Sequence, residues 1–149
     1  MKYILWDFDG TLAYRDGLWT VTLLNVLQKN GFSSIKKELL RPFLSIGFPW
    51  NSPDTPHSKL FNGKTWWEYM ESYFEEIFTI LQFDTDTSKN LSKQVRDEYL
   101  NVNYWHLFDD VEITLKKIDE NGIKNIILSN HVPELTKIVS QLGISKYFF

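Results

Sequence analysis

A short apolar segment that ends at two carboxylates is the feature that most constrains how this chain can fold. Residues 3–6 (Tyr-Ile-Leu-Trp) are apolar without alternation, and Asp7 and Asp9 follow at once. A run without alternation predicts a strand buried on both faces, as in a parallel sheet covered by helices. Residues 125–128 (Asn-Ile-Ile-Leu) repeat this pattern and end at Ser129. The two segments therefore predict two strands of a parallel sheet.

Predicted helices flank the second of these strands. An amphipathic segment from Val111 to Ile118 comes before it, with Asp109 as its expected N-cap. A further helix is predicted over residues 133–142, because Pro133 suits the first turn of a helix. Strand, helix, strand and helix in this order are typical of a parallel α/β fold.

Residues 15–106 have a different character, and no segment there is predicted to be a strand. Asp16 is the expected cap of the first helix, Pro42 should end or kink the second, and Thr65 with Glu68 forms a capping box at the start of the third. Four helices are predicted, over residues 18–28, 35–43, 65–82 and 91–102. The expected organisation is an α/β core, residues 1–14 and 107–149, interrupted by a helical module, residues 15–106.

The carboxylates at the end of the first strand suggest a binding site. In an open α/β sheet the ligand crevice lies beyond the carboxyl ends of the strands, where Asp7 and Asp9 fall. Burying two anions without compensation is costly, so a cation or another neutralising partner is expected. Gly10 allows a sharp turn and a close approach of backbone N–H groups to an anion, and Thr11 adds a hydroxyl donor.

Residues 7–12 (Asp-Phe-Asp-Gly-Thr-Leu) after an apolar strand resemble the first signature of the haloacid dehalogenase-like hydrolase superfamily. Residues 127–130 (Ile-Leu-Ser-Asn) resemble its second signature, and the helical interval is similar to the helical cap of the family. The segment from residues 48–50 (Phe-Pro-Trp) through residues 66–67 (Trp-Trp) also resembles the phosphoglycolate phosphatase-like branch. The resemblance implies a Rossmann-like core with an inserted helical cap, and it covers only the N-terminal part of the family's fold.

The resemblance also implies an activity, the Mg²⁺-dependent hydrolysis of a small phosphomonoester. Asp7 would attack phosphorus and form an aspartyl-phosphate, and Asp9 would act as general acid and base. Mg²⁺ would bind the Asp7 carboxylate and the Asp9 backbone carbonyl. Family members that are true dehalogenases lack an acid at the position of Asp9, so its presence favours phosphate esters over a dehalogenase activity.

Four further residues would hold the phosphoryl oxygens in this interpretation. They are the hydroxyl groups of Thr11 and Ser129 and the backbone N–H groups of Gly10 and Asn130. A plain turn at Asp9-Gly10 or a strand-end helix cap at Ser129 is the structural alternative. A phosphomutase with the same nucleophile would differ only in the group that accepts the phosphoryl group.

The family's catalytic lysine and last acidic metal ligands would follow Phe149, and neither is present in this chain. Without the strand that carries those acids, residues 3–6 would form an unpaired apolar edge. Completion of the sheet by further residues, by another chain or by self-association is therefore expected. The alternative function is a catalytically inert fragment or assembly unit.

Other residues have more than one interpretation. Trp66 and Trp67 are predicted to fill a core rather than to contact substrate. His57 is predicted to be a solvated loop residue, whereas His131 either lines the site or lies on the surface. The net charge of −3, the absence of cysteine and the absence of an apolar leader predict a cytoplasmic protein that binds neither nucleic acid nor membranes.

Overall fold

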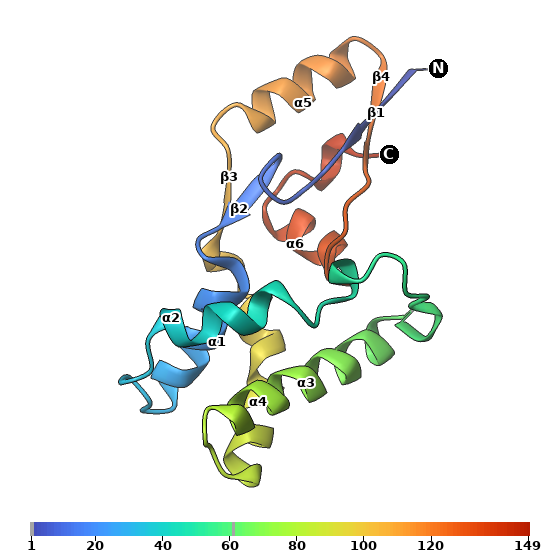
Figure 1. Cartoon of the computed structure of the whole chain (residues 1–149). Coiled ribbons are helices and arrows are strands. Elements are labelled where there is room, and N and C mark those ends of the chain that lie inside the picture. Colours follow the sequence, from blue (N-terminus) through green and yellow to red (C-terminus); the bar gives the residue numbers. More distant parts are fainter. Residues whose placement is uncertain (1, 61) are drawn as a thin grey trace. The chain divides into compact units, whose positions relative to one another are not determined.

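The computed structural model describes residues 2–60 and 62–149, which form two compact units (Figure 1). The first unit comprises Met1–Asp16 and Asn101–Phe149, and the second comprises Gly17–Leu100. The second unit therefore lies within the interval that was expected to be the helical module, residues 15–106. Among the helices of the described residues, none has the combined length and apolar character needed to cross a bilayer.

The first unit is built on a parallel pair of strands, β1 (Lys2–Trp6) and β4 (Ile123–Ile127). Their register places Trp6 beside Ile127, so the two strands end at the same edge. Helix α5 (Val111–Glu120) packs on β4, and helix α6 (Leu135–Gln141) follows it in the chain. The predicted parallel α/β fold is thereby confirmed. Phe148 forms an isolated parallel bridge with Asn125.

Strand β1 is more exposed than its apolar sequence predicts. Tyr3 and Leu5 are 49% and 61% exposed, whereas Ile4 and Trp6 are half-buried. Alternate residues of a strand point to opposite faces, so one face of β1 is open. Among the described strands, β1 pairs with β4 alone. The expectation that both faces are buried is therefore wrong for this chain.

The side chain of Asn125 joins β1 and β4 to the rest of the first unit. Its Oδ1 accepts a hydrogen bond from Trp6 Nε1 at 2.9 Å. Its Nδ2 donates to the carbonyl oxygens of Leu115 in α5, at 3.4 Å, and of Tyr147, at 3.2 Å. Tyr147 ends the short 3₁₀ helix η5 (Ser145–Tyr147). A buried amide is tolerated here because both of its ends are hydrogen-bonded.

Replacing Asn125 with Leu is expected to lower the free energy of unfolding by about 2–3 kcal/mol. The substitution leaves the Trp6 indole N–H and two carbonyl groups without this partner, and each unsatisfied buried group costs about 1–3 kcal/mol. Urea denaturation measures the change. Asn121→Leu is the control, since that side chain is exposed and bonds only within the end of its own helix. Equal stability of the two variants would contradict this role of Asn125.

A second, antiparallel pair of strands corrects the prediction that residues 15–106 contain no strand. Strand β2 (Ala13–Arg15) pairs with β3 (Trp105–Leu107), so that Arg15 lies beside Trp105. The guanidinium of Arg15 lies 4.6 Å above the ring of Tyr104, in the short 3₁₀ helix η4 (Val102–Tyr104). Three-residue strands are too short to show a hydrophobic period, and the partners are far apart in the sequence.

The second unit is helical, as the sequence predicts. Its elements are α1 (Leu18–Lys29), α2 (Lys37–Leu40), η1 (Arg41–Ser45), η2 (Pro49–Asn51), η3 (Ser58–Leu60), α3 (Gly63–Ile80) and α4 (Thr85–Tyr99). Helix α4 packs against α1 and α3 (Figure 1). Trp19 stacks on Tyr99 with ring centroids 3.8 Å apart, and Trp66 and Trp67 are buried beside it. The prediction that these two tryptophans fill a core is confirmed.

The helix N-caps differ from the predicted ones. Helix α3 begins after Asn62, whose side chain accepts a hydrogen bond from the Thr65 N–H at 3.0 Å, so Thr65 is not the cap. Gly17 takes the cap position of α1 in place of Asp16, and Asp110 that of α5 in place of Asp109. Neither of these two caps makes a side-chain hydrogen bond. Each helix begins one to three residues from the expected residue, a range over which polar residues compete for the cap.

Candidate active site

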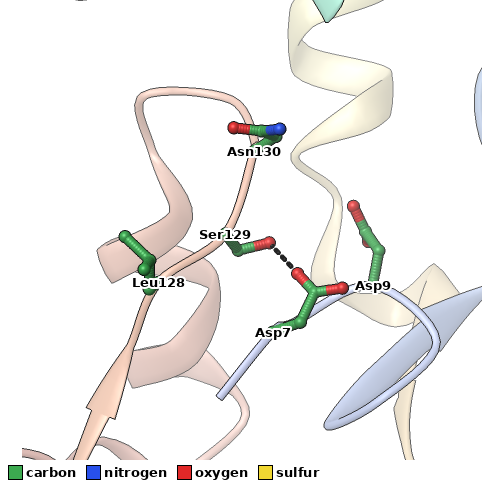
Figure 2. Close-up of a pocket in the computed structure, with 5 residues that line it drawn as sticks. All are labelled: Asp7, Asp9, Leu128, Ser129 and Asn130. Carbon is green, nitrogen blue, oxygen red and sulfur yellow. Dashed lines mark hydrogen bonds between the residues drawn. The ribbon is translucent and has the colours of Figure 1, made fainter. Parts of the chain in front are cut away.

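The ends of β1 and β4 bring together residues that are far apart in the sequence. Because the strands are parallel neighbours, Asp7 and Ser129 emerge at the same edge of the sheet. Ser129 Oγ donates a hydrogen bond to Asp7 Oδ1 at 2.6 Å (Figure 2). The N–H of Phe8 donates to the same oxygen at 2.8 Å. One carboxylate oxygen of Asp7 is thus fixed by two donors, and Figure 2 shows the other turned away from Ser129.

A cleft of about 560 Å³ opens beside this pair. Its lining residues are Asp7, Asp9, Leu128, Ser129 and Asn130 (Figure 2). Four of these five were predicted site residues. Leu128 was not, because an apolar residue at the end of a strand is usually part of a core, yet here it is 69% exposed.

Gly10 and Thr11 take part in the turn after β1 and do not line this cleft. The N–H of Gly10 donates to the carbonyl oxygen of Ala13 at 2.9 Å, and the positive φ of Gly10 permits this turn. Thr11 lines a separate, smaller cavity beside Asp110 and Val111, at the start of α5. A contact between the Gly10 N–H and a phosphoryl oxygen would require the bond to Ala13 to be shared or given up.

Asp9 has the electrostatic character of a proton donor. Burial, with a smaller contribution from the negative charge of Asp7, raises the pKa of Asp9 from its ordinary value of 3.8 to about 6. A carboxyl group with a pKa in this range can donate a proton near neutral pH and then accept one. Asp7, by contrast, is exposed and hydrogen-bonded through one oxygen. The two carboxyl groups therefore lie in different environments although they are two residues apart.

His131 lies beside Asp9 in the interior, so its alternative placement on the surface is wrong. Its side chain is 1% exposed, and its Nε2 lies 3.6 Å from Asp9 Oδ1. Burial lowers the pKa of His131 to about 4, so that its imidazole is neutral at pH 7. Because burial disfavours the charged form of both groups, the contact pairs a neutral imidazole with a carboxyl group and is not an ion pair.

Replacing Asp9 with Asn is expected to stabilise the protein above about pH 6 and to have little effect below about pH 4. The folded protein holds the Asp9 proton more tightly than the unfolded chain, because the pKa rises from 3.8 to about 6 on folding. Stability is therefore lost as the pH rises through this window, and a neutral amide avoids the loss. Urea denaturation in metal-free buffer, below about pH 4 and above about pH 6, measures the difference in stability between Asp9→Asn and the wild-type protein. Asp119→Asn, at an exposed carboxylate of α5, is the control; a wild-type protein more stable than Asp9→Asn at neutral pH would contradict the prediction.

The oxygen ligands of the cleft fit a hard cation. Among residues 2–60 and 62–149, no group of three or more His, Asp or Glu side chains is placed to hold a metal ion. Mg²⁺, however, is commonly held by one or two carboxylates together with water and substrate phosphate oxygens. Asp7 and Asp9 line one cleft, and Asp9 Oδ1 is buried without a hydrogen-bond partner in the described residues. The exposed carboxylate of Asp7, with the backbone carbonyl of Asp9 beside it, suits Mg²⁺ in its usual partial coordination by protein.

Comparison with known proteins gives matches among solved structures alone. The sequence matches no protein-family profile and no curated protein. The fold matches a protein from Thermotoga maritima assigned as a β-phosphoglucomutase, with a TM-score of 0.70 and 17% identity over 99% of this chain and 59% of that one. A predicted phosphoglycolate phosphatase from Haemophilus somnus matches with a TM-score of 0.59 and 18% identity, over 99% of this chain and 60% of that one.

A 2-haloacid dehalogenase from Pseudomonas syringae is also similar, with a TM-score of 0.59 and 17% identity over 99% of this chain and 61% of that one. A haloacid dehalogenase-like hydrolase from Bacteroides fragilis matches with a TM-score of 0.51. The chain thus spans about 60% of the length of these proteins. The resemblance predicted from residues 7–12 and 127–130 is confirmed for the fold. This chain has the fold of the haloacid dehalogenase-like hydrolases, over about 60% of their length.

Proposed function

We propose that this chain supplies the nucleophile and the general acid of a Mg²⁺-dependent hydrolase that acts on small phosphomonoesters. The observation that carries the proposal is the pairing of Ser129 Oγ with Asp7 Oδ1 at 2.6 Å, at the mouth of a cleft that Asp9 also lines. One oxygen of Asp7 is held in place, and the other is available for attack on phosphorus. A proton donor with a pKa of about 6 lies next to it.

The reaction proceeds in two displacements. In the first, the free carboxylate oxygen of Asp7 attacks phosphorus, the bond from phosphorus to the ester oxygen breaks, and that oxygen takes the proton of Asp9. In the second, the Asp9 carboxylate takes a proton from water, and the water oxygen attacks phosphorus. The bond from phosphorus to Asp7 then breaks. An alcohol and inorganic phosphate leave, and both aspartates return to their starting states.

The remaining groups of the cleft would orient the phosphoryl group. Asn130 stands on the β4 side of the cleft and would donate its backbone N–H to a phosphoryl oxygen. Ser129 has one hydroxyl proton, which goes to Asp7 in this structure, so it would donate to a phosphoryl oxygen only on giving up that bond, and Thr11 only after a rearrangement of its turn. Mg²⁺, held by Asp7 and the Asp9 backbone carbonyl, would offset the repulsion between the carboxylate and the phosphate. Phosphate esters are favoured over halides as substrates because a halide leaves without a proton, and Asp9 would then have no role.

Phosphate release from a panel of phosphomonoesters tests this proposal. Sugar phosphates, phosphoglycolate and aryl phosphates are incubated with the protein in Mg²⁺ and, separately, in EDTA. Release that requires Mg²⁺ is the expected result. The absence of Mg²⁺-dependent release across the whole panel, from a folded protein, would overturn it.

The open edge of β1 favours a second candidate function, assembly with another copy of the chain. An exposed strand with apolar side chains, here Tyr3 and Leu5, is a template for pairing with a further strand. Light scattering after size exclusion should then show dimers or larger species for the wild-type chain and monomers for Leu5→Lys. Ile113→Lys, at an equally exposed apolar residue of α5, is the matched control. A monomeric wild-type chain at high concentration would remove this candidate.

A further inference from the structure

One oxygen of the general acid lacks the hydrogen bond that its burial demands. Asp9 Oδ1 is buried and has no hydrogen-bond partner in the part of the chain that the structure describes. A buried carboxyl oxygen without a partner destabilises the folded state, because it loses its hydrogen bonds to water. His131 Nε2 lies 3.6 Å from this oxygen.

The ring of His131 is held by aromatic packing that includes the first signature itself. Phe8, between the two aspartates, meets the imidazole edge-on, with centroids 5.2 Å apart and ring planes at 83°. Trp105 of β3 lies 5.3 Å from the imidazole and 5.5 Å from Phe8. The three rings are buried together. His131 therefore cannot swing away from Asp9 without displacing a packed cluster.

The chemistry of Asp9 makes this contact useful. A neutral imidazole carries one N–H, and with that proton on Nε2 the distance of 3.6 Å needs to shorten by about 0.5 Å to reach the usual hydrogen-bond range. If Oδ1 is held in the interior, the second oxygen of Asp9 faces the cleft. Proton transfer to the leaving oxygen depends on that orientation, because a general acid must stand within hydrogen-bond reach of the atom that it protonates.

We propose that His131 is a positioning residue for Asp9, whose Nε2–H holds Asp9 Oδ1 so that the other oxygen delivers the proton to the leaving group. The proposal rests on the proposed function for the step that it assists. Its first part, the restraint of the Asp9 side chain, is a property of the folded protein and can be measured without turnover.

The kinetic test uses two nearly isosteric replacements, His131→Gln and His131→Met. Gln keeps an N–H donor at the end of the side chain, whereas Met removes it. The value of kcat/KM is measured with an alkyl phosphate, whose leaving oxygen needs a proton, and with p-nitrophenyl phosphate, whose leaving group departs without one. This constant reports the first displacement, in which Asp9 is the acid.

His131→Met is expected to lower kcat/KM at least tenfold more for the alkyl phosphate than for p-nitrophenyl phosphate, and His131→Gln should restore most of the difference. Val132→Ala, at the buried neighbour of His131, is the packing control and should affect both substrates equally. Equal losses on both substrates for His131→Met, or no restoration by Gln, would overturn the proposal.

A second measurement separates this proposal from the proposed function. The three-bond couplings from Asp9 Cγ to its backbone nitrogen and carbonyl carbon report the χ1 rotamer by NMR. A single rotamer is expected in the wild-type protein and in His131→Gln, and rotamer averaging in His131→Met. If the wild-type protein hydrolyses no phosphate ester, the proposed function fails, yet these couplings still decide the restraint. An Asp9 rotamer unchanged in His131→Met would overturn it.

Discussion

Asp7→Asn is expected to abolish turnover, with a loss on the order of 10⁴-fold or more in kcat, the scale seen when a covalent nucleophile is removed. The amide oxygen is a poor nucleophile toward phosphorus, so no aspartyl-phosphate forms. Asn nevertheless has the shape of Asp, and its carbonyl oxygen can accept the hydrogen bonds of Ser129 Oγ and the Phe8 N–H. The fold should therefore be kept.

Three measurements check this result together. Phosphate release reports turnover, mass spectrometry of quenched protein reports the phosphorylated intermediate, and thermal unfolding reports the fold. Asp119→Asn, which removes an exposed carboxylate that does not line the cleft, should behave as the wild-type protein does in all three. Retained turnover in folded Asp7→Asn would remove this residue from the nucleophile role.

Asp9→Asn is expected to give the second largest effect, and it should depend on the leaving group. Loss of a general acid costs about 10²–10⁴-fold when the leaving oxygen needs a proton. With an alkyl phosphate the first displacement should be slowed by that amount. With p-nitrophenyl phosphate the first displacement should remain fast and the second should be slow, because the base that activates water is missing.

A pre-steady-state burst of p-nitrophenol, followed by slow turnover, is the signature of this behaviour. Its amplitude should approach one equivalent per active site, and the phosphorylated protein should accumulate. The double variant Asp7→Asn with Asp9→Asn is the control and should give no burst. An equal slowing of both displacements on both substrates would show that Asp9 acts on the whole site and not through its proton.

The arrangement of Asp7 and Ser129 could be predicted from the sequence because it follows from two local patterns and one rule of topology. Each residue directly follows an apolar run, and parallel neighbouring strands end at the same edge. These two rules are enough to predict that the side chains of Asp7 and Ser129 lie close together. The place of Thr11 could not be predicted in this way. The turn after β1 closes through hydrogen bonds that the N–H groups of Thr11, Leu12 and Ala13 donate to the Phe8 carbonyl oxygen, and these depend on the whole loop.

The burial of His131 beside Asp9 was beyond the reach of sequence patterns. Its packing partners, Phe8 and Trp105, come from two other segments of the chain, and neither is related to it by a helical or strand period. The unpaired edge of β1 was expected in the absence of a further strand, but its open face was not, because a continuous apolar run favours a strand buried on both faces. Tyr3 and Leu5 suit a buried strand but are exposed here.

The short antiparallel pair of β2 and β3 has a consequence for how the chain could be rebuilt. Arg15 and Trp105 are register partners, and the second unit, Gly17–Leu100, lies between them in the sequence. The pairing of β2 with β3 fixes only the two ends of the segment between these strands. A short hairpin turn could join the same two ends. We expect inserts of different length between β2 and β3 to be tolerated while this ladder stays the same, because the entropic cost of loop closure grows only slowly with length.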